Sequence, residues 1–133
     1  HLMGKNNCWV VTSFDNMDEI SISDNSKIYK MHNNQEFSEE IFNPEDFNIK
    51  KRDISLIKGQ DAKYNSEQLI KLLKGQINNK KLEAYRDIVS LNCAAALLIS
   101  AEFSDFKEAL NAVKLFIEEG KAYDFLSQKL CGN

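Results

Sequence analysis

The adjacent acids Asp18 and Glu19 are the residues of this sequence best suited to chemistry. They follow a short apolar, β-prone run, Cys8–Thr12, across a mostly polar stretch. Carboxylate oxygens are the ligands that Mg²⁺ prefers, and one or two acids suffice because the ion keeps several waters. Crevices beyond the carboxyl ends of parallel strands often bind ligands. By itself, however, an Asp-Glu pair in a loop is more often a solvated turn, so these residue types alone do not establish a metal site.

The other polar residues that could do chemistry favour structural roles. Asn92 lies in an apolar helical segment, where a hydrogen-bonding role is more common than ligand binding. Arg86 and Asp87 are neighbours on one helix and should not face each other, which favours ion pairs with other elements or a capping role. Asp61 and Asn65 fit the start of a helix. We predict no catalytic role for any of them.

The cysteines and histidines form no recognisable metal or nucleophile motif. Cys8, Cys93 and Cys131 are odd in number and far apart, and neither His1 nor His32 lies near them in the sequence. Zinc sites and disulfide frameworks need closer and paired spacing. Reduced cysteines are therefore expected, which favours the cytoplasm. His32 is predicted to be exposed beside a turn.

Composition argues against nucleic-acid and membrane partners. The net charge is −3, and the densest basic run, Lys50–Arg52, has no interleaved aromatic residue, so no nucleic acid is expected. The longest apolar run, Ala94–Ile99, is far shorter than the roughly 20 residues of a membrane helix. A chain of 133 residues is predicted to form a single domain, residues 1–133.

The first half of the sequence predicts strands. Cys8–Thr12 is predicted as a buried strand of the parallel type, and Ile20–Ser23 as a half-buried strand because apolar and polar residues alternate. Lys27–His32 and Glu36–Phe42 are predicted to pair as an antiparallel hairpin, since Asn33-Asn34 between them tolerates positive φ. A short helical turn capped by Asn43 should follow these strands.

The second half of the sequence predicts helices. The expected segments run from a cap at Asn65 or Ser66 to Gly75, over 80–101, from a capping box at Asp105 to Gly120, and over 122–130. Within the second helix, Cys93–Ile99 is apolar on nearly every side, so it should be buried almost all round. The predicted fold class is α/β, with a partial mixed sheet (a short parallel-type strand plus an antiparallel hairpin) before a C-terminal bundle of three to four helices.

Five segments of the sequence, in register, resemble anthranilate phosphoribosyltransferases. The segments are Val10-Val11 with Asn16–Ser21, Asn43–Phe47, Gly59–Ala62 with Asn65, Arg86–Leu97, and Glu118–Ala122. Because they cover the chain from about Cys8 onwards, it is identified as a member of this family, of the nucleoside phosphorylase/phosphoribosyltransferase type. The resemblance implies transfer of phosphoribosyl from phosphoribosyl pyrophosphate to anthranilate, in tryptophan biosynthesis. It also implies Mg²⁺ bound by Asp18 and Glu19.

The sequence departs from the family pattern close to the acidic residues. Asn16 stands where the family usually carries glycine, and Thr12 and Ser13 replace a histidine and a glycine that are often found after the strand. Gln60 occupies a position where glycine is common. Asparagine is the next best residue at positive φ, so the turn at Asn16 is expected to survive.

Several family elements do not occur in this sequence. They include the Gly-Thr-Gly-Gly-Asp loop that wraps the pyrophosphate, a Lys-His-Gly-Asn stretch and an arginine that contacts anthranilate; all five glycines are isolated. We therefore expect a C-terminal fragment of such an enzyme, inactive alone and able to self-associate through an exposed sheet edge. A fragment of a related pyrimidine-nucleoside phosphorylase and a non-catalytic remnant or partner module are the alternatives.

Overall fold

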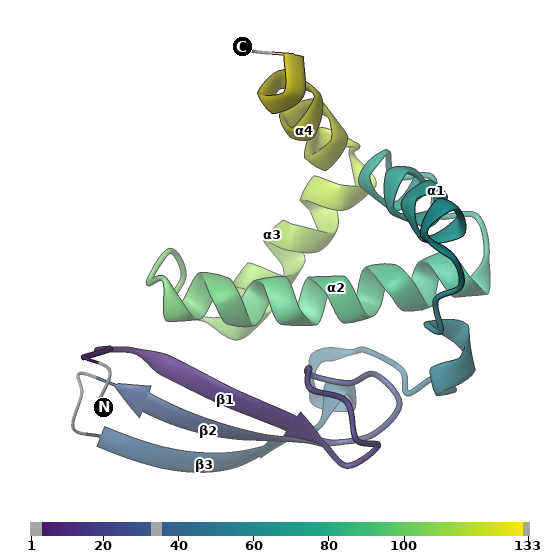
Figure 1. Ribbon diagram of the computed structural model, residues 1–133. Helices are drawn as coiled ribbons and strands as arrows, with labels where there is room; N and C mark the ends of the chain where they lie inside the picture. The colour runs from purple at the N-terminus through teal and green to yellow at the C-terminus, as the bar shows by residue number, and fades with distance from the viewer. Residues whose placement is uncertain (1–3, 33–35, 132–133) are drawn as a thin grey trace.

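The structure, a computed structural model, describes residues 4–32 and 36–131. In this part of the chain a three-stranded sheet is followed by four helices, and the long helix α2 lies across one face of the sheet (Figure 1). The elements are β1 (Cys8–Ser13), β2 (Ser26–His32), β3 (Glu36–Phe42), α1 (Ala62–Leu73), α2 (Lys80–Ile99), α3 (Phe106–Glu118) and α4 (Lys121–Cys131). The α/β class and the C-terminal group of helices are thus confirmed.

The sheet is antiparallel, in the order β1-β2-β3. β2 and β3 pair as the sequence predicts, with His32 opposite Glu36, and the expected turn residues Asn33-Asn34 lie outside the described residues. The prediction of a parallel-type β1, and hence of a mixed sheet, is wrong for the described strands because β1 pairs antiparallel with β2. Parallel pairing needs a crossover connection, usually a helix, whereas residues 14–25 fold back as a loop.

β1 is half-buried, not fully buried as predicted. Val11 packs against the core, whereas its neighbour Val10 is 61% exposed. Paired residues share a face of the sheet, so Tyr29, opposite Val10, lies on the same uncovered face and is also exposed. An antiparallel sheet can leave one face to solvent in this way.

The core lies between the covered face of the sheet, the loop before β2, and helices α2 and α3. Its buried members include Ile20, Ile22, Ile28, Phe42, Ile49, Ile88, Leu91 and Leu110. Phe42 stacks on Phe47 with ring centroids 4.7 Å apart, and the ring centroids of Phe106 and Phe47 are also 4.7 Å apart. These rings join β3, the predicted helical turn (a 3-10 helix at Pro44–Phe47) and the start of α3.

The segment Ile20–Ser23 is not a strand, contrary to the prediction. Ile20 and Ile22 are fully buried, but the segment has no strand partner among the described residues. The side chain of Asn92 binds both the N–H and the C=O of Ile20, and the C=O of Ile22 accepts from the Arg52 N–H at 2.9 Å. Main-chain groups paired in this way do not need a sheet ladder.

The helices begin at polar caps. Asp61 caps α1 by accepting from the Tyr64 N–H at 2.7 Å, so the predicted cap at Asn65 or Ser66 is wrong. Asn65 instead bonds to the N–H and C=O of Gln60, which confirms that Asp61 and Asn65 both act at the helix start. Asp105 caps α3 as predicted, accepting from the N–H of the third helical residue at 2.8 Å.

The C-terminal part of α2 is not buried all round. Ala94 and Ala95 are buried, whereas Cys93 and Ala96 are exposed, because only one side of this part of α2 packs against the core. In the described part of the chain, no helix combines the length and apolar character needed to cross a membrane.

Candidate metal-binding loop

The acidic residues Asp18 and Glu19 lie in the loop of residues 14–25 between β1 and β2, here called the acidic loop (Figure 1). Both residues are exposed. Two adjacent carboxylates are therefore open to a ligand arriving from solvent. The loop leaves the sheet at the C-terminal end of β1, which is where the sequence placed the pair.

The acidic loop begins with a tight turn. The Ser13 N–H donates to the Met17 C=O at 3.0 Å, and the Met17 N–H donates to Ser13 Oγ at 2.8 Å. Asn16 has a φ of 66°, so the sequence-based expectation of a positive φ at this position is confirmed. The Phe14 N–H donates to the Asn25 C=O at 2.9 Å and closes the base of the loop. The main chain just before Asp18 is thus held in place.

The carboxylate of Asp15 is bound by three hydroxyl groups from both arms of the loop. Ser13 Oγ and Ser23 Oγ donate to it, and Ser21 Oγ donates to Asp15 Oδ2 at 2.6 Å. Asp15 with these three serines is here called the Asp15 cluster. Partial burial by itself would raise the pKa of Asp15, but the hydrogen bonds from the serines and the Met17 main chain outweigh it and hold the pKa below its usual range. Asp15 is therefore charged at neutral pH.

The far side of the acidic pair is fastened to α2 and β2. Asn92 Oδ1 accepts from the Ile20 N–H, and Asn92 Nδ2 donates to the Ile20 C=O, both at 3.0 Å. The Ser21 N–H donates to Ser26 Oγ at 2.9 Å. The hydrogen-bonding role predicted for Asn92 is thus confirmed. As a result, Asp18 and Glu19 sit between two anchored stretches of main chain.

The donor set of the acidic loop fits Mg²⁺ that also binds water and a further ligand. Within residues 4–32 and 36–131, no group of three or more Asp, Glu, His or Cys residues is arranged to hold a metal. Asp18 and Glu19 together offer two carboxylates. Mg²⁺ is commonly held by one or two carboxylates together with substrate phosphates and water, so two acids match this mode of binding.

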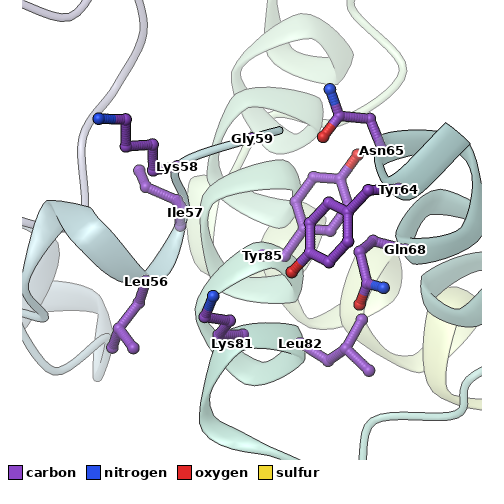
Figure 2. Close-up of a pocket in the computed structure, with 10 residues that line it drawn as sticks. All are labelled: Leu56, Ile57, Lys58, Gly59, Tyr64, Asn65, Gln68, Lys81, Leu82 and Tyr85. Carbon is purple, nitrogen blue, oxygen red and sulfur yellow. The ribbon is translucent and has the colours of Figure 1, made fainter. Parts of the chain in front are cut away.

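An open pocket of about 270 Å³ lies where the segment before α1 meets α1 and α2 (Figure 2). It is lined by Leu56, Ile57, Lys58, Gly59, Tyr64, Asn65, Gln68, Lys81, Leu82 and Tyr85. Burial raises the pKa of Tyr85, and the negative charge of Glu19 raises it further. The pocket was not predicted, because its walls come from three segments that no single motif connects.

The remaining candidates have structural surroundings. Asp87 is 3% exposed, and Arg52 Nη2 and Arg86 Nη2 lie 3.3 and 2.8 Å from its carboxylate oxygens. Arg86 also pairs with Glu118 at 2.8 Å. The predicted ion pairs between elements are confirmed. The expectation that Arg86 and Asp87 do not face each other is wrong, because Arg86 Nε and Nη2 donate to Asp87 Oδ1 at 3.0 and 2.8 Å. His32 is exposed, as expected.

Residues 1–123 match the sequence model of a family described as "Glycosyl transferase family, a/b domain". The chain belongs to this family. An anthranilate phosphoribosyltransferase of Thermoanaerobacter sp. (strain X514) is 32% identical over 128 residues, which are 96% of this chain and 36% of the relative. That of Pelagibacter ubique (strain HTCC1062) is 30% identical over 120 residues, 90% of this chain and 34% of the relative. This family member thus spans about a third of the length of the curated relatives it matches.

Solved structures share the fold of this glycosyl transferase family member. The Thermus thermophilus anthranilate phosphoribosyltransferase superposes with a TM-score of 0.77 at 20% identity, covering 92% of this chain and 34% of that one. The Saccharomyces cerevisiae enzyme in complex with PRPP and Mg gives 0.78 at 18% identity, covering 91% and 33%. At these identities the likeness establishes the fold, and the PRPP and Mg are ligands of the yeast protein.

Proposed function

We propose that this chain forms the metal-binding part of an anthranilate phosphoribosyltransferase, whose reaction joins anthranilate to the phosphoribosyl group of phosphoribosyl pyrophosphate. One observation carries the proposal. An exposed Asp18-Glu19 pair lies on a loop fixed at both ends, in a chain 32% identical over 128 residues to an enzyme of that name. A Mg²⁺ ligand set of two carboxylates suits a substrate that brings its own phosphates.

The chemical role of the loop follows from the charge of the leaving group. Asp18 and Glu19 would hold Mg²⁺, which when bound offsets the negative charge that builds up on the departing pyrophosphate. The hydrogen bonds at Met17 and Ile20 hold the main chain on either side of the two acidic residues. A preset arrangement avoids the cost of ordering the loop when substrate binds.

The partners in this proposal are phosphoribosyl pyrophosphate and anthranilate. The 133 residues contain no glycine-rich loop that could wrap the pyrophosphate, so we expect the chain by itself to be inactive. An odd number of well-separated cysteines favours a reducing compartment, and we propose the cytoplasm.

The test supplies the remaining family elements in trans. The 133-residue chain is co-expressed with the N-terminal two-thirds of the Thermoanaerobacter relative, and formation of phosphoribosylanthranilate is assayed in the purified complex. We expect activity that requires Mg²⁺ and is lost in Asp18→Asn and Glu19→Gln. Lys63→Ala, which changes an exposed residue on α1, serves as the control and should leave the activity unchanged.

Two results would count against the proposal. A stable complex without activity would favour the non-catalytic remnant or partner module, and activity that persists in Asp18→Asn would remove the acidic pair from the mechanism. Phosphorolysis of a pyrimidine nucleoside by the same complex, in place of phosphoribosyl transfer, would favour the related phosphorylases.

A further inference from the structure

We propose that Asp15 is a positioning residue, which through the Asp15 cluster fixes Asp18 and Glu19 in their ligand-binding arrangement before any ligand arrives. This inference rests on the proposed function of the acidic pair. Asp15 is not itself a candidate ligand, because its carboxylate oxygens are taken up by the hydroxyl groups of Ser13, Ser21 and Ser23.

The cluster joins the two arms of the acidic loop. Ser13 precedes the acidic pair and Ser21 and Ser23 follow it, yet all three hydroxyls meet on the carboxylate of Asp15. The segment that carries Asp18 and Glu19 is thus closed into a short ring by charge-assisted hydrogen bonds, which are roughly twice as strong as neutral ones. A closed ring leaves the exposed pair few alternative arrangements.

Each arm then passes this restraint to the main chain beside the pair. Ser13 Oγ donates to Asp15 and accepts from the Met17 N–H at 2.8 Å, which places the residue just before Asp18. Ser21 donates to Asp15 at 2.6 Å, and its own N–H donates to Ser26 Oγ at 2.9 Å. Ser21 and Ser26 are fully buried, so the second arm is anchored in the protein interior.

The Ser13 hydroxyl is a feature of this sequence rather than of the family pattern. The resemblance described above places a glycine at position 13 in many members, and a glycine there has no side chain to bind Asp15. In this chain Ser13 provides one of the three hydroxyls of the cluster. Ser13→Gly therefore removes one of the three hydroxyl groups that bind Asp15 and leaves the other two in place.

The test compares Asp15→Ala with Asp24→Ala in the 133-residue chain. Both variants remove one negative charge from the acidic loop, but Asp24 pairs with Lys51 at 3.5 Å and bonds to the Asn25 N–H, not to the cluster. Hydrogen exchange at the Met17 and Ser21 amides is measured by NMR without metal, and Mg²⁺ alone is then titrated while the Asp18 and Glu19 resonances are followed. Amide protection in α2 and α3 reports whether each variant is folded.

We expect exchange at Met17 and Ser21 to be about tenfold faster or more in Asp15→Ala, because charge-assisted hydrogen bonds that hold the loop closed are lost. Mg²⁺ binding should weaken at least about threefold more than in Asp24→Ala, since the loop must be ordered on binding. Ser13→Gly also removes the acceptor of the Met17 N–H, so exchange at Met17 does not report on Asp15 in that variant. Its Ser21 exchange and its Mg²⁺ binding should shift in the same direction by less, and these two readouts are used if Asp15→Ala does not fold.

Equal exchange at Met17 and Ser21 in the Asp15 and Asp24 variants would overturn the positioning role, whatever the metal titration shows. Faster exchange specific to the Asp15 cluster supports it. If the unaltered chain shows no Mg²⁺-dependent shifts at Asp18 or Glu19, the proposed metal site is wrong, and the exchange data still decide separately whether Asp15 orders the loop.

Discussion

Single side chains take over hydrogen bonds that secondary structure normally provides. The N–H and C=O of Ile20 are both bound by Asn92, which also donates to the Ile88 C=O at 3.0 Å. One side chain on α2 thus replaces a strand partner and ties the acidic loop to the helix. Replacing a residue with such a role should lower the stability of the fold considerably.

We predict that Asn92→Ala lowers the free energy of unfolding by about 2–4 kcal/mol, because the two main-chain groups of buried Ile20 lose their partner. Urea denaturation followed by circular dichroism measures the change. Cys93→Ala is the control, since it alters an exposed residue on the same helix and should change stability by no more than about 0.5 kcal/mol. Equal effects of the two substitutions would contradict the role of Asn92.

The lowered pKa of Asp15 predicts a dependence of stability on pH. A carboxyl group whose pKa is lower in the folded protein stabilises the fold above its unfolded pKa, and this contribution is lost as pH falls through the folded value. Acidification below about pH 4 should therefore reduce the urea midpoint of the unaltered chain more steeply than that of Asp15→Asn. Parallel midpoint curves for the two proteins would show that Asp15 does not contribute.

The main chain after α1 lies very close to the main chain at the end of α3. Gly75, after α1, has a φ of 68°, and a Cβ placed there would lie 2.4 Å from the C=O oxygen of Glu118. Gly120, after α3, also has a positive φ of 73°, but its nearest neighbour would be the C=O oxygen of Lys74 at 3.4 Å. The two glycines share a left-handed backbone conformation, but only Gly75 lacks room for a side chain.

Substituting these two glycines tests how much the close approach of α1 and α3 matters for stability. We predict that Gly75→Ala costs about 2–5 kcal/mol, the sum of the left-handed conformation and a main-chain displacement between the helices. Gly120→Ala should cost only about 1–2 kcal/mol, since the conformational part alone applies. Chemical denaturation of both variants checks the difference, and equal losses would mean that the close approach of α1 and α3 does not matter.

The sequence predicted the helices better than the strands, for a physical reason. Helix periodicity, the cap at Asp105 and the closing Gly120 each depend on residues that are close together in the sequence. The apolar–polar alternation of Ile20–Ser23 was equally clear, but the main-chain groups of Ile20 and Ile22 bond to Asn92 and Arg52, which lie far along the chain. Only the folded chain shows that such a segment is a loop.

The candidate site was predicted only in part. The position of Asp18 and Glu19 after β1 followed from the pattern and the family resemblance. The Asp15 cluster did not, although Ser13, Ser21 and Ser23 surround Asp15 within a short stretch. Serines in a polar loop are ordinary, and nothing in their spacing shows that their hydroxyls converge on one carboxylate.

At the scale of the whole molecule, the sheet has an uncovered face and an unpaired edge at β1. Among the described residues, no strand lies beside β1 on the side away from β2. β1 is uncharged and rich in β-forming residues, whereas the opposite edge strand, β3, carries Glu36, Glu39 and Glu40. Charged residues discourage pairing at an edge, so β1 is the edge more able to pair with another chain.

We therefore predict that the 133-residue chain self-associates at high concentration through β1 and the apolar face beside it, where Val10 is 61% exposed. Val10→Lys should weaken the association at least about tenfold, because it sets like charges against each other across the contact. Leu130→Lys is the control: it changes a residue that is 73% exposed on α4, and should leave the association unaltered. Sedimentation equilibrium measures all three proteins. A strictly monomeric chain, or an equal loss of association in both variants, would show that the β1 edge is not the contact.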